Sequence, residues 1–533
     1  MKNILVIQLS RLGDLVQTLP LIKALKQDIT ECRVTLFCVR EFAPILKSAP
    51  FIDRVASLPF SEVRTALAPD DRMEPTALEP ILQLPELQEE YDRVINLTHT
   101  LGSAYISSRV SARAVYGRID TYPGEVRVAG DWGKYLFSVT EDRALSMFNL
   151  VDVYMGMGGI APRPVTGYLA ADETQKETAL KLLDANGYRG EGRLIGIHMG
   201  ANKAHRTWGV ERFAELGNGI SDAGEDEIVL IGSSQEADMG EEYLASTGGG
   251  VINLIGRTDL YSLPGVLSLC DLLVTNDTGP AHIAAGVGTK VVGIFFSTAF
   301  FGETAPYGEG HVILQTERKC APCKAQDMCA EVACREDIPV EAVKAVLLGK
   351  HASVSIGGIG VYTSRFHDNG TLIYEPLASS GRGPYQEALL SRMMWGAALG
   401  LENGQAPGYE NPEINTRAKD WLKRLSALKG IYRKGGEAAL GILGAFSRRP
   451  INQRKIMSLA GEIEKTEEKI RSLDNGLGPL RAFHQHHIMD MDRVNYPELA
   501  RLFASKYSRM LGVTENFRET LGRVLQEEES GNV

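Results

Sequence analysis

Short apolar segments of strand length, each ending at small or polar residues, recur along the chain and constrain its fold most strongly. The first, residues 3–8, precedes a Ser-Arg-Leu-Gly-Asp loop and then a helical pattern of leucines. Residues 33–39 and 93–97 have the same strand character, with helical or loop stretches between them. Strands that alternate with helices predict a parallel, doubly wound sheet.

The pattern starts again after a stretch rich in glycine and proline at residues 158–167. The apolar segments of this second half are residues 194–198, 227–231, 272–275 and 291–295. Ligands of open α/β sheets bind beyond the carboxyl ends of the strands, and two successive α/β halves usually hold a small molecule in the cleft between them. We therefore predict two Rossmann-like domains facing a cleft, at residues 1–165 and 166–349.

Beyond residue 350 the character of the sequence changes. A hairpin is predicted over residues 361–377, because Asp-Asn-Gly at 368–370 lies between segments of strand type. From residue 384 to the end the pattern is mostly helical. Residues 350–533 are thus predicted to form a hairpin plus a helical extension, for which the sequence indicates no role.

The composition excludes several classes of protein. A chain of 533 residues exceeds what one hydrophobic core usually supports, and 44% hydrophobic with 23% charged residues is typical of globular proteins. A formal net charge of -10 argues against a nucleic-acid partner. The amino terminus reaches Arg11 and Asp14 before any small-residue cleavage site, and no apolar run approaches the roughly 18 residues that span a bilayer. We expect a cytoplasmic protein, with peripheral contact at the inner membrane as an option.

Three segments carry candidate chemistry: Ser-Arg-Leu-Gly-Asp at 10–14 with Thr-Leu-Pro at 18–20, His-Met-Gly-Ala-Asn-Lys-Ala-His-Arg-Thr-Trp at 198–208, and Asn-Asp-Thr-Gly-Pro-Ala-His at 276–282. Together they resemble glycosyltransferase family 9, the ADP-heptose:lipopolysaccharide heptosyltransferases, over approximately residues 1–345. The resemblance implies a GT-B fold. It also implies an inverting transfer from a nucleotide-sugar, such as an ADP-sugar, without a catalytic metal.

In the first segment, a glycine after a strand lets backbone amides approach a ligand, and a carboxylate at a helix start can point into the cleft. Asp14 is therefore the candidate general base that takes a proton from an acceptor hydroxyl, and Gly13 is assigned to donor binding. The alternative is that Asp14 only caps the helix that follows.

In the second segment, the resemblance implies that Gly200, Ala201 and Arg206 bind the donor phosphates. The family usually has lysine where this chain has Arg206, and arginine still supplies a permanent charge and a bidentate fork. Lys203 is a rival for the same contact. The alternative is a solvated basic loop.

The third segment matches the family's Asp-Thr-Gly-x-x-His signature residue for residue. Its position after a strand turns the N–H groups of Thr278 and Gly279, with the helix dipole, toward the cleft and the diphosphate. Asp277 is expected to hold the donor sugar's hydroxyls or to orient His282, although a lone helical histidine is more often structural. Glu236 resembles the family's acidic residue that binds the donor ribose; the alternative is a surface glutamate near a turn.

One departure from the family leaves the identity of the donor open. Where the family often places a glycine after the strand at 291–295, this chain has Phe296 followed by Ser297 and Thr298.

Four cysteines, Cys320, Cys323, Cys329 and Cys334, lie within fifteen residues as C-x2-C-x5-C-x4-C. Four thiolates so close in a reducing compartment suit a structural zinc or iron ion, and the alternative is four unlinked thiols on a loop. Some relatives that glycosylate autotransporter adhesins carry a four-cysteine iron site. The resemblance therefore admits iron and a protein acceptor.

The helical extension contains a basic stretch. Residues 417–455 hold eleven Lys and Arg against two Asp and Glu, a net +9 (11 minus 2). Trp421, Leu425 and Leu428 recur there near helical spacing, so the segment is either a basic amphipathic helix at an anionic membrane or acidic partner, or a helix whose apolar face packs in its own bundle. A histidine group at 484, 486 and 487 resembles a metal cluster only loosely, and an exposed polar helix is the preferred interpretation.

The leading hypothesis is a transferase that moves a heptose-like sugar from ADP-heptose, or a related nucleotide-sugar, to a lipopolysaccharide-core glycolipid or to a protein. One alternative is a nucleotide-sugar-binding scaffold without catalytic activity. Another is a different GT-B enzyme, such as a sugar-nucleotide epimerase. The sequence leaves the sugar, the nucleotide, the acceptor and the oligomeric state open.

Overall fold

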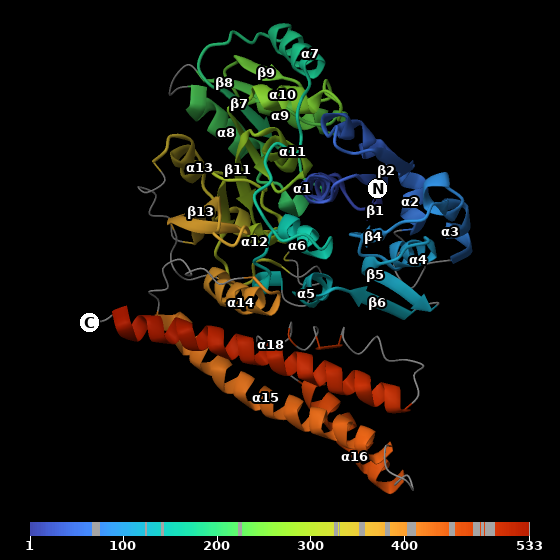
Figure 1. Cartoon of the computed structure of the whole chain (residues 1–533). Helices are drawn as coiled ribbons and strands as arrows, with labels where there is room; N and C mark the ends of the chain where they lie inside the picture. Colours follow the sequence, from blue (N-terminus) through green and yellow to red (C-terminus); the bar gives the residue numbers. More distant parts are fainter. Residues whose placement is uncertain are drawn as a thin grey trace. The chain divides into compact units, whose positions relative to one another are not determined.

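A computed structural model shows the architecture of the chain (Figure 1). It describes residues 1–66, 75–122, 125–139, 143–221, 226–323, 329, 331–350, 358–378, 384–401, 412–446, 453–472, 480, 484–485 and 496–531. The chain divides into two compact units, one made of Met1–Ile119 and Phe148–Pro384, the other of Asp120–Met147 and Tyr385–Val533.

The first sheet has six strands in the order β3-β2-β1-β4-β5-β6. Its strands are β1 (Lys2–Gln8), β2 (Cys32–Val39), β3 (Arg54–Leu58), β4 (Arg93–Asn96), β5 (Val115–Tyr122) and β6 (Glu125–Ala129). The pairs among β1 to β5 are parallel. Most residues of β1 and β2 are buried, as expected for a parallel sheet with helices on both faces. The accompanying helices in the first unit are α1 (Leu12–Asp28), α2 (Phe60–Ala66), α3 (Pro75–Leu82), α4 (Leu101–Arg109) and α6 (Leu150–Met157).

The second sheet has eight strands in the order β14-β13-β12-β11-β10-β7-β8-β9. Its parallel strands are β7 (Leu194–His198), β8 (Glu227–Leu230), β9 (Val251–Asn253), β10 (Leu272–Asn276), β11 (Lys290–Phe295) and β12 (Val312–Thr316). Its helices are α7 (Glu173–Asp184), α8 (Val210–Ser221), α9 (Ala237–Ala245), α10 (Leu263–Leu269), α11 (Gly279–Val287), α12 (Phe301–Thr304) and α13 (Val340–Leu347). Two α/β sheets built of parallel strands confirm the predicted fold class.

The predicted hairpin is present as β13 (Ile359–Phe366) and β14 (Leu372–Ala378), which pair antiparallel. β13 also pairs antiparallel with β12, so the hairpin continues the second sheet. The domain boundaries near residues 165 and 349 stay a prediction.

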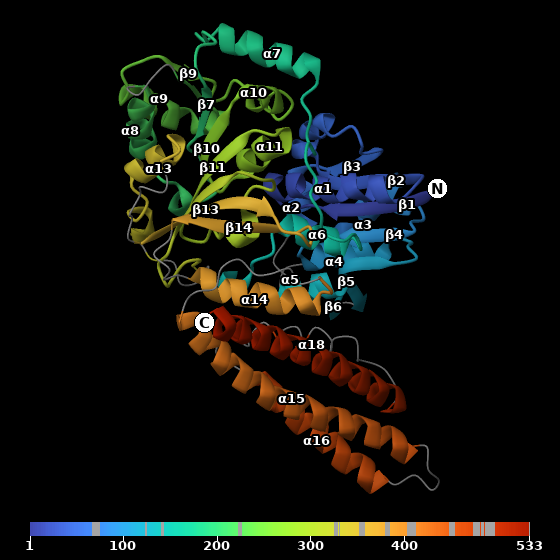
Figure 2. The ribbon, with the colours of Figure 1, turned by 60° about the vertical axis from the view of Figure 1, so that its left-hand side comes forward.

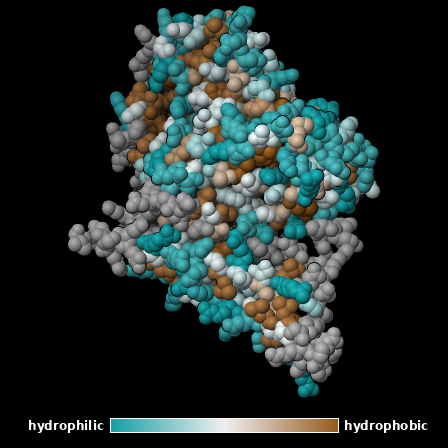
Figure 3. Space-filling view, viewed as in Figure 1, coloured by the Kyte–Doolittle hydropathy of each residue, from teal (hydrophilic) through white to brown (hydrophobic). Residues whose placement is uncertain are grey.

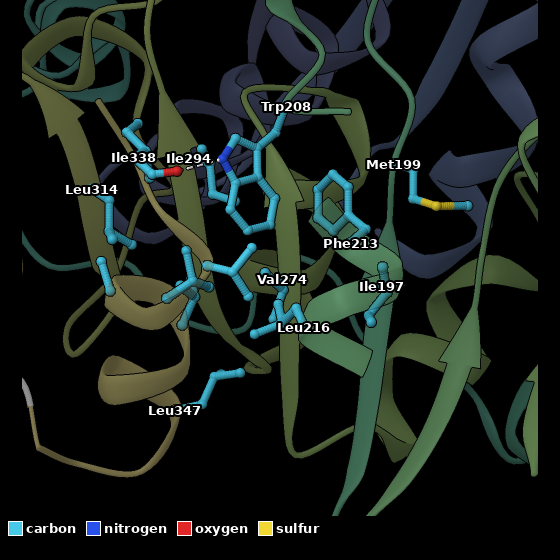
Figure 4. Packing of buried hydrophobic residues seen from close by; sticks show 14 of the residues in the cluster. Ile197, Met199, Trp208, Phe213, Leu216, Val274, Ile294, Leu314, Ile338 and Leu347 are labelled. Atoms are coloured by element: carbon cyan, nitrogen blue, oxygen red, sulfur yellow. Dashed lines mark hydrogen bonds between the residues drawn. The ribbon is translucent and has the colours of Figure 1, made fainter. Parts of the chain in front are cut away.

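The core beside the second sheet is centred on Trp208 (Figure 4). Its side chain is fully buried, its Nε1–H donates to the backbone oxygen of Ile338 at 2.9 Å, and its ring meets the Phe213 ring edge-on with centroids 5.0 Å apart. Because the indole satisfies its one polar group inside the core, the loop that precedes Trp208 is tied to a rigid part of the protein.

The second unit is mainly helical, with α5 (Asp131–Val139), α14 (Pro384–Ala398), α15 (Pro412–Phe446), α16 (Gln453–Arg471) and α18 (Tyr496–Gly531). The helices α15, α16 and α18 lie alongside one another (Figure 2). Trp421, Leu425 and Leu428 of the basic stretch are buried in this unit, which confirms the packing alternative for the apolar face. Leu440 and Met457 remain exposed, and Figure 3 shows such apolar residues among hydrophilic ones on this unit.

The histidine group near the carboxyl end differs from the preferred interpretation. His484 is buried, and its Nε2 lies 3.1 Å from a carboxylate oxygen of Glu467. The sequence pattern did not reveal this partner, which lies seventeen residues away on α16. Residues 486 and 487 lie outside the described part of the chain.

Within the described residues, no helix has both the length and the apolar character needed to cross a membrane.

Candidate active site

The first turns of α1 and α11 meet in the first unit, beyond the carboxyl ends of β1 and β10. Two glycines allow the approach: a Cβ added to Gly13 would lie 3.1 Å from Cδ2 of His282, and one added to Gly279 would lie 3.1 Å from Cδ2 of Leu12. Each helix amino terminus carries free N–H groups and the positive end of a dipole. The site therefore combines two positively polarised helix ends, which favours an anionic ligand.

Asp14 stands in the first turn of α1, and its carboxylate accepts a hydrogen bond from the Arg11 N–H at 3.1 Å. The helix-capping contact proposed as the alternative is thus present. Burial raises the pKa of Asp14 above its ordinary value, and the negative charge of Asp277 raises it further. The hydrogen bond from Arg11 and the positive charges of Arg11 and His282 lower it, but burial is the largest effect. The structure thereby brings the candidate base within electrostatic reach of the third segment, as the two-domain prediction requires.

Asp277 is held by an ion pair. Nη2 of Arg206 donates to its Oδ2, and the Thr304 hydroxyl donates to the same oxygen at 3.2 Å. The side chains of Asp277 and Arg206 are only 8% and 14% exposed. Among the described residues, the buried Nε of Arg206 has no hydrogen-bond partner. Arg206 therefore combines a fixed position with a donor that no described protein group occupies, whereas Lys203 is exposed.

His282 is buried where α11 faces Gly13. Burial lowers the pKa of His282 below its ordinary value, although the negative charges of Asp277 and Asp14 act in the opposite direction. The described part of the chain offers no hydrogen-bond partner to its buried Nδ1. A neutral imidazole at this place can donate or accept one hydrogen bond toward a ligand.

A second group of site residues surrounds Gly200. A Cβ there would lie 1.4 Å from Oε1 of Glu236, so the carboxylate rests on the backbone and only glycine fits. The other carboxylate oxygen accepts from the N–H and hydroxyl of Ser233 at 2.6 and 2.8 Å. Burial raises the pKa of Glu236, but His198 and Ser233 outweigh burial and bring the pKa to about 2. Glu236 is therefore ionised.

His198 connects this group to the third segment, and sequence reasoning gave it no role. Its Nε2 lies 3.4 Å from Oε1 of Glu236, and its Nδ1 lies 3.1 Å from the Thr275 hydroxyl and 3.2 Å from that of Thr278. Its position at the end of a buried strand, two residues before a glycine, was the available signal.

Asn276 was also missed, and it joins the second and third segments. Its side-chain N–H groups donate to the backbone oxygens of Met199 and Gly200, and its side-chain oxygen accepts from the Trp208 N–H at 3.1 Å. The loop contains Gly200, the half-buried Ala201 and Arg206. Asn276 at the end of β10 holds the start of this loop at Gly200, and Trp208 holds its end in the core.

The four cysteines are free thiols. Burial and the other three thiols together raise the pKa of Cys323 to about 11. Cys334 is buried, while Cys320 and Cys329 are exposed. In the part of the chain that the structure describes, which omits residues 324–328 and 330, no three His, Cys, Asp or Glu side chains are placed to hold a metal ion. Metal binding therefore stays a prediction.

Two parallel α/β sheets, with helix amino termini and charged groups gathered beyond their strands, define a protein of the GT-B class. The fold is similar to the crystal structure of a glycosyl transferase family 9 protein from Veillonella parvula, with a TM-score of 0.53 and 18% identity. That similarity covers 66% of this chain and 98% of the other. Residues 85–332 match the family described as Glycosyltransferase family 9 (heptosyltransferase). The chain thus carries a family 9 domain and is an enzyme of the glycosyltransferase class.

Two curated relatives from Haemophilus influenzae have similar sequences. Lipooligosaccharide heptosyltransferase 2 is 26% identical over 315 residues, which cover 57% of this chain and 84% of the relative. Lipopolysaccharide core heptosyltransferase OpsX is 24% identical over 315 residues, which cover 57% of this chain and 82% of the relative.

Proposed function

We propose that this protein transfers a heptose-like sugar from ADP-heptose, or a related nucleotide-sugar, to a lipopolysaccharide-core glycolipid with inversion at the anomeric carbon. The names of the curated relatives support the sugar and the class of acceptor. The observation that carries the proposal is the position of Asp14 close to Asp277 and His282, at the meeting point of two helix amino termini.

In this mechanism Asp14 accepts the proton of the acceptor hydroxyl while the hydroxyl oxygen attacks the anomeric carbon. The bond from that carbon to the diphosphate breaks, and the diphosphate leaves with the bonding electrons. General-base catalysis of this kind contributes about 10²- to 10⁴-fold to the rate.

The donor is expected to bind through its negative charge. Arg206, whose Nε has no described protein partner, and the N–H groups of Thr278 and Gly279 stabilise the charge that develops on the diphosphate. Glu236 is ionised beside Gly200 and can accept hydrogen bonds from ribose hydroxyls. Since these groups are in place before the ligand binds, they lose little free energy to reorganisation.

Replacing Asp14 with asparagine tests the general base. The asparagine side chain keeps an oxygen that can accept from the Arg11 N–H but lacks the charge that binds a proton, so we expect D14N to bind ADP-heptose normally and to lose at least about 10²-fold in kcat. Thermal shift with the donor and a transfer assay measure the two properties.

Asp172, which caps α7 through the Gln175 N–H, provides the matched control D172N. Near-normal turnover of D14N would remove Asp14 from the mechanism. Donor binding by the unmodified protein without transfer to any glycolipid or protein acceptor would instead indicate a scaffold, and turnover of the donor without an acceptor would indicate an epimerase.

We also propose that the four cysteines hold a structural zinc or iron ion. The support for this proposal is the C-x2-C-x5-C-x4-C spacing of four free thiols. Metal analysis of protein purified without chelator tests this proposal, and absence of a stoichiometric metal would contradict it.

We also propose that α15 contacts a membrane surface peripherally. Its apolar face is buried in the second unit, so the contact would be made by its exposed cations. These cations are Lys419, Lys423, Arg433 and Lys434. Flotation with anionic liposomes is expected at low salt and not at high salt.

A further inference from the structure

His198 is the last residue of β7, and its backbone is fixed inside the second sheet. β7 lies between β8 and β10, and His198 is paired with Thr275 in the parallel ladder. The residue is only 5% exposed. A buried imidazole is costly to leave without polar partners, so the groups around its two nitrogens determine how the ring stands.

Two threonine hydroxyls hold one nitrogen of the ring. Nδ1 of His198 lies 3.1 Å from the hydroxyl of Thr275 and 3.2 Å from that of Thr278. The two hydroxyls are 3.2 Å apart, and both also lie within hydrogen-bond distance of the backbone oxygen of Asn276. Since Thr275 is on β10 and Thr278 is the N-cap residue of α11, the ring is oriented by the segment that carries the predicted diphosphate site.

The other nitrogen faces the carboxylate of Glu236. Nε2 of His198 lies 3.4 Å from Oε1 of this carboxylate. Although burial raises the pKa of Glu236, His198 and Ser233 bring that pKa to about 2, so the carboxylate is ionised and can only accept hydrogen bonds. Nε2 therefore carries a hydrogen, and in the neutral imidazole Nδ1 accepts from a threonine hydroxyl.

One oxygen of the Glu236 carboxylate is left to meet a ligand. Oε2 accepts from both the N–H and the hydroxyl of Ser233, at 2.6 and 2.8 Å, which uses its two lone pairs. Oε1 lies above Gly200, the first residue of the phosphate loop, which we define as residues 200–206. A Cβ added to Gly200 would lie 1.4 Å from Oε1 and 3.2 Å from Nε2 of His198. The remaining acceptor capacity is therefore on the oxygen that the histidine ring faces.

We propose that His198 is a positioning residue that holds Oε1 of Glu236 in place for a ribose hydroxyl of the donor, so that the site prefers a ribonucleotide to a deoxyribonucleotide. The inference rests on the proposed function, in which Glu236 binds the ribose. His198 acts through Glu236 and not by contact with the donor. A carboxylate fixed at both oxygens keeps the geometry that a hydroxyl needs, whereas one held by Ser233 alone can turn about its side-chain torsions.

Calorimetry with ADP, 2′-deoxy-ADP and 3′-deoxy-ADP measures this preference. We define the ribose ratio as the Kd of the more weakly bound deoxynucleotide divided by the Kd of ADP. A hydrogen bond to a charged group is stronger than one between neutral groups, so the unmodified protein is expected to show a ribose ratio of at least about 10. E236A removes the carboxylate, and its ribose ratio is expected to be about 1.

Two substitutions of His198 separate the roles of its nitrogens. The amide of asparagine reaches the position of Nδ1 and not that of Nε2, so H198N should keep the contact with the threonines and lower the ribose ratio at least about 5-fold. The longer side chain of glutamine brings an amide N–H near the position of Nε2, so H198Q should keep most of the ratio.

The matched control is H367N, the same change at a half-buried histidine in the turn of the hairpin, and it should leave the ribose ratio unchanged. A loss of stability alone would weaken the binding of all three nucleotides alike. The ratio therefore responds to the ribose contact and not to a merely structural role of His198.

The outcomes separate this inference from the proposed function. If E236A loses the ribose ratio but H198N keeps it, His198 does not position the carboxylate and the proposed function stands. Equal loss in H198N and H198Q would also overturn the inference, because a donor at Nε2 would then not matter. If the unmodified protein shows no preference for ADP, or E236A retains the preference, the inference fails together with the assignment of Glu236 to the ribose. Failure to bind ADP at all would overturn the proposed function as a whole.

Discussion

At the scale of single residues, the site depends on opposing effects on a few charges. Burial raises the pKa of Asp14, which keeps its affinity for a proton high enough to act as a base, while Arg11 limits the rise. Glu236 shows the reverse balance, since His198 and Ser233 outweigh burial. One carboxylate is therefore suited to proton transfer and the other to permanent negative charge.

The pH dependence of sugar transfer should depend on the pKa of Asp14. Because only ionised Asp14 accepts a proton, kcat/KM is expected to fall toward acid with a limb above the ordinary aspartate value of 3.8. Arg11 lowers the pKa of Asp14, so R11Q should move this limb to higher pH. The pH–rate profile measures both, with K2Q as the control for loss of an exposed cation. A limb that R11Q leaves in place would contradict the assignment of Asp14.

At the scale of secondary-structure elements, loops are held by partners distant in sequence. Trp208 anchors the phosphate loop in the core beside the second sheet, and Asn276 fastens the same loop to β10. In the second unit, Glu467 of α16 accepts from Lys506 and Tyr507 of α18 at 2.7 and 2.6 Å. Buried polar contacts thus determine how neighbouring elements align.

Replacing Glu467 with glutamine tests the helix contact. Without its carboxylate partner, the buried Lys506 must either keep an unpaired charge or release its proton, so the free energy of unfolding should fall by about 3–5 kcal/mol, measured by urea denaturation. Burial lowers the pKa of Lys506 to about 8, below its ordinary 10.5. At pH values between these two, Lys506 holds a proton in the unfolded chain more often than in the folded one, so the free energy of unfolding of the unmodified protein should rise with pH. The exposed Glu464 on the same helix gives the control E464Q. Equal stability of E467Q and E464Q would contradict the prediction.

At the scale of the whole molecule, the second unit combines two parts of the chain that are far apart in sequence. The Tyr135 ring, from residues 120–147, meets the Trp395 ring edge-on at 5.4 Å between centroids, and Trp395 meets Phe517 at 5.3 Å. Arg392 donates to the backbone oxygen of Met147. The carboxyl-terminal helices therefore complete the core around residues 120–147.

A chain shortened by removal of residues 385–533 tests this dependence. Tyr135 and its neighbours would lose the aromatic partners that bury them, so we expect lower solubility and a lower Tm. Differential scanning fluorimetry and size-exclusion chromatography measure the change. A shortened chain as stable and soluble as the full one would show that the helices are an independent appendage.

The amino-acid sequence by itself was enough to predict the two α/β sheets and the hairpin, and to identify the three segments that carry the candidate site residues. Strand periodicity and glycine positions are local properties, and every predicted strand is present within a residue or two. Short strands such as β9, with three residues, lacked enough local signal. Only the tertiary structure decided that Asp14 lies near Asp277, that His198 and Asn276 support the site, that His484 is buried, and that residues 120–147 join the helices. Those facts depend on contacts between distant parts of the chain, and no local pattern encodes the partner in such a contact.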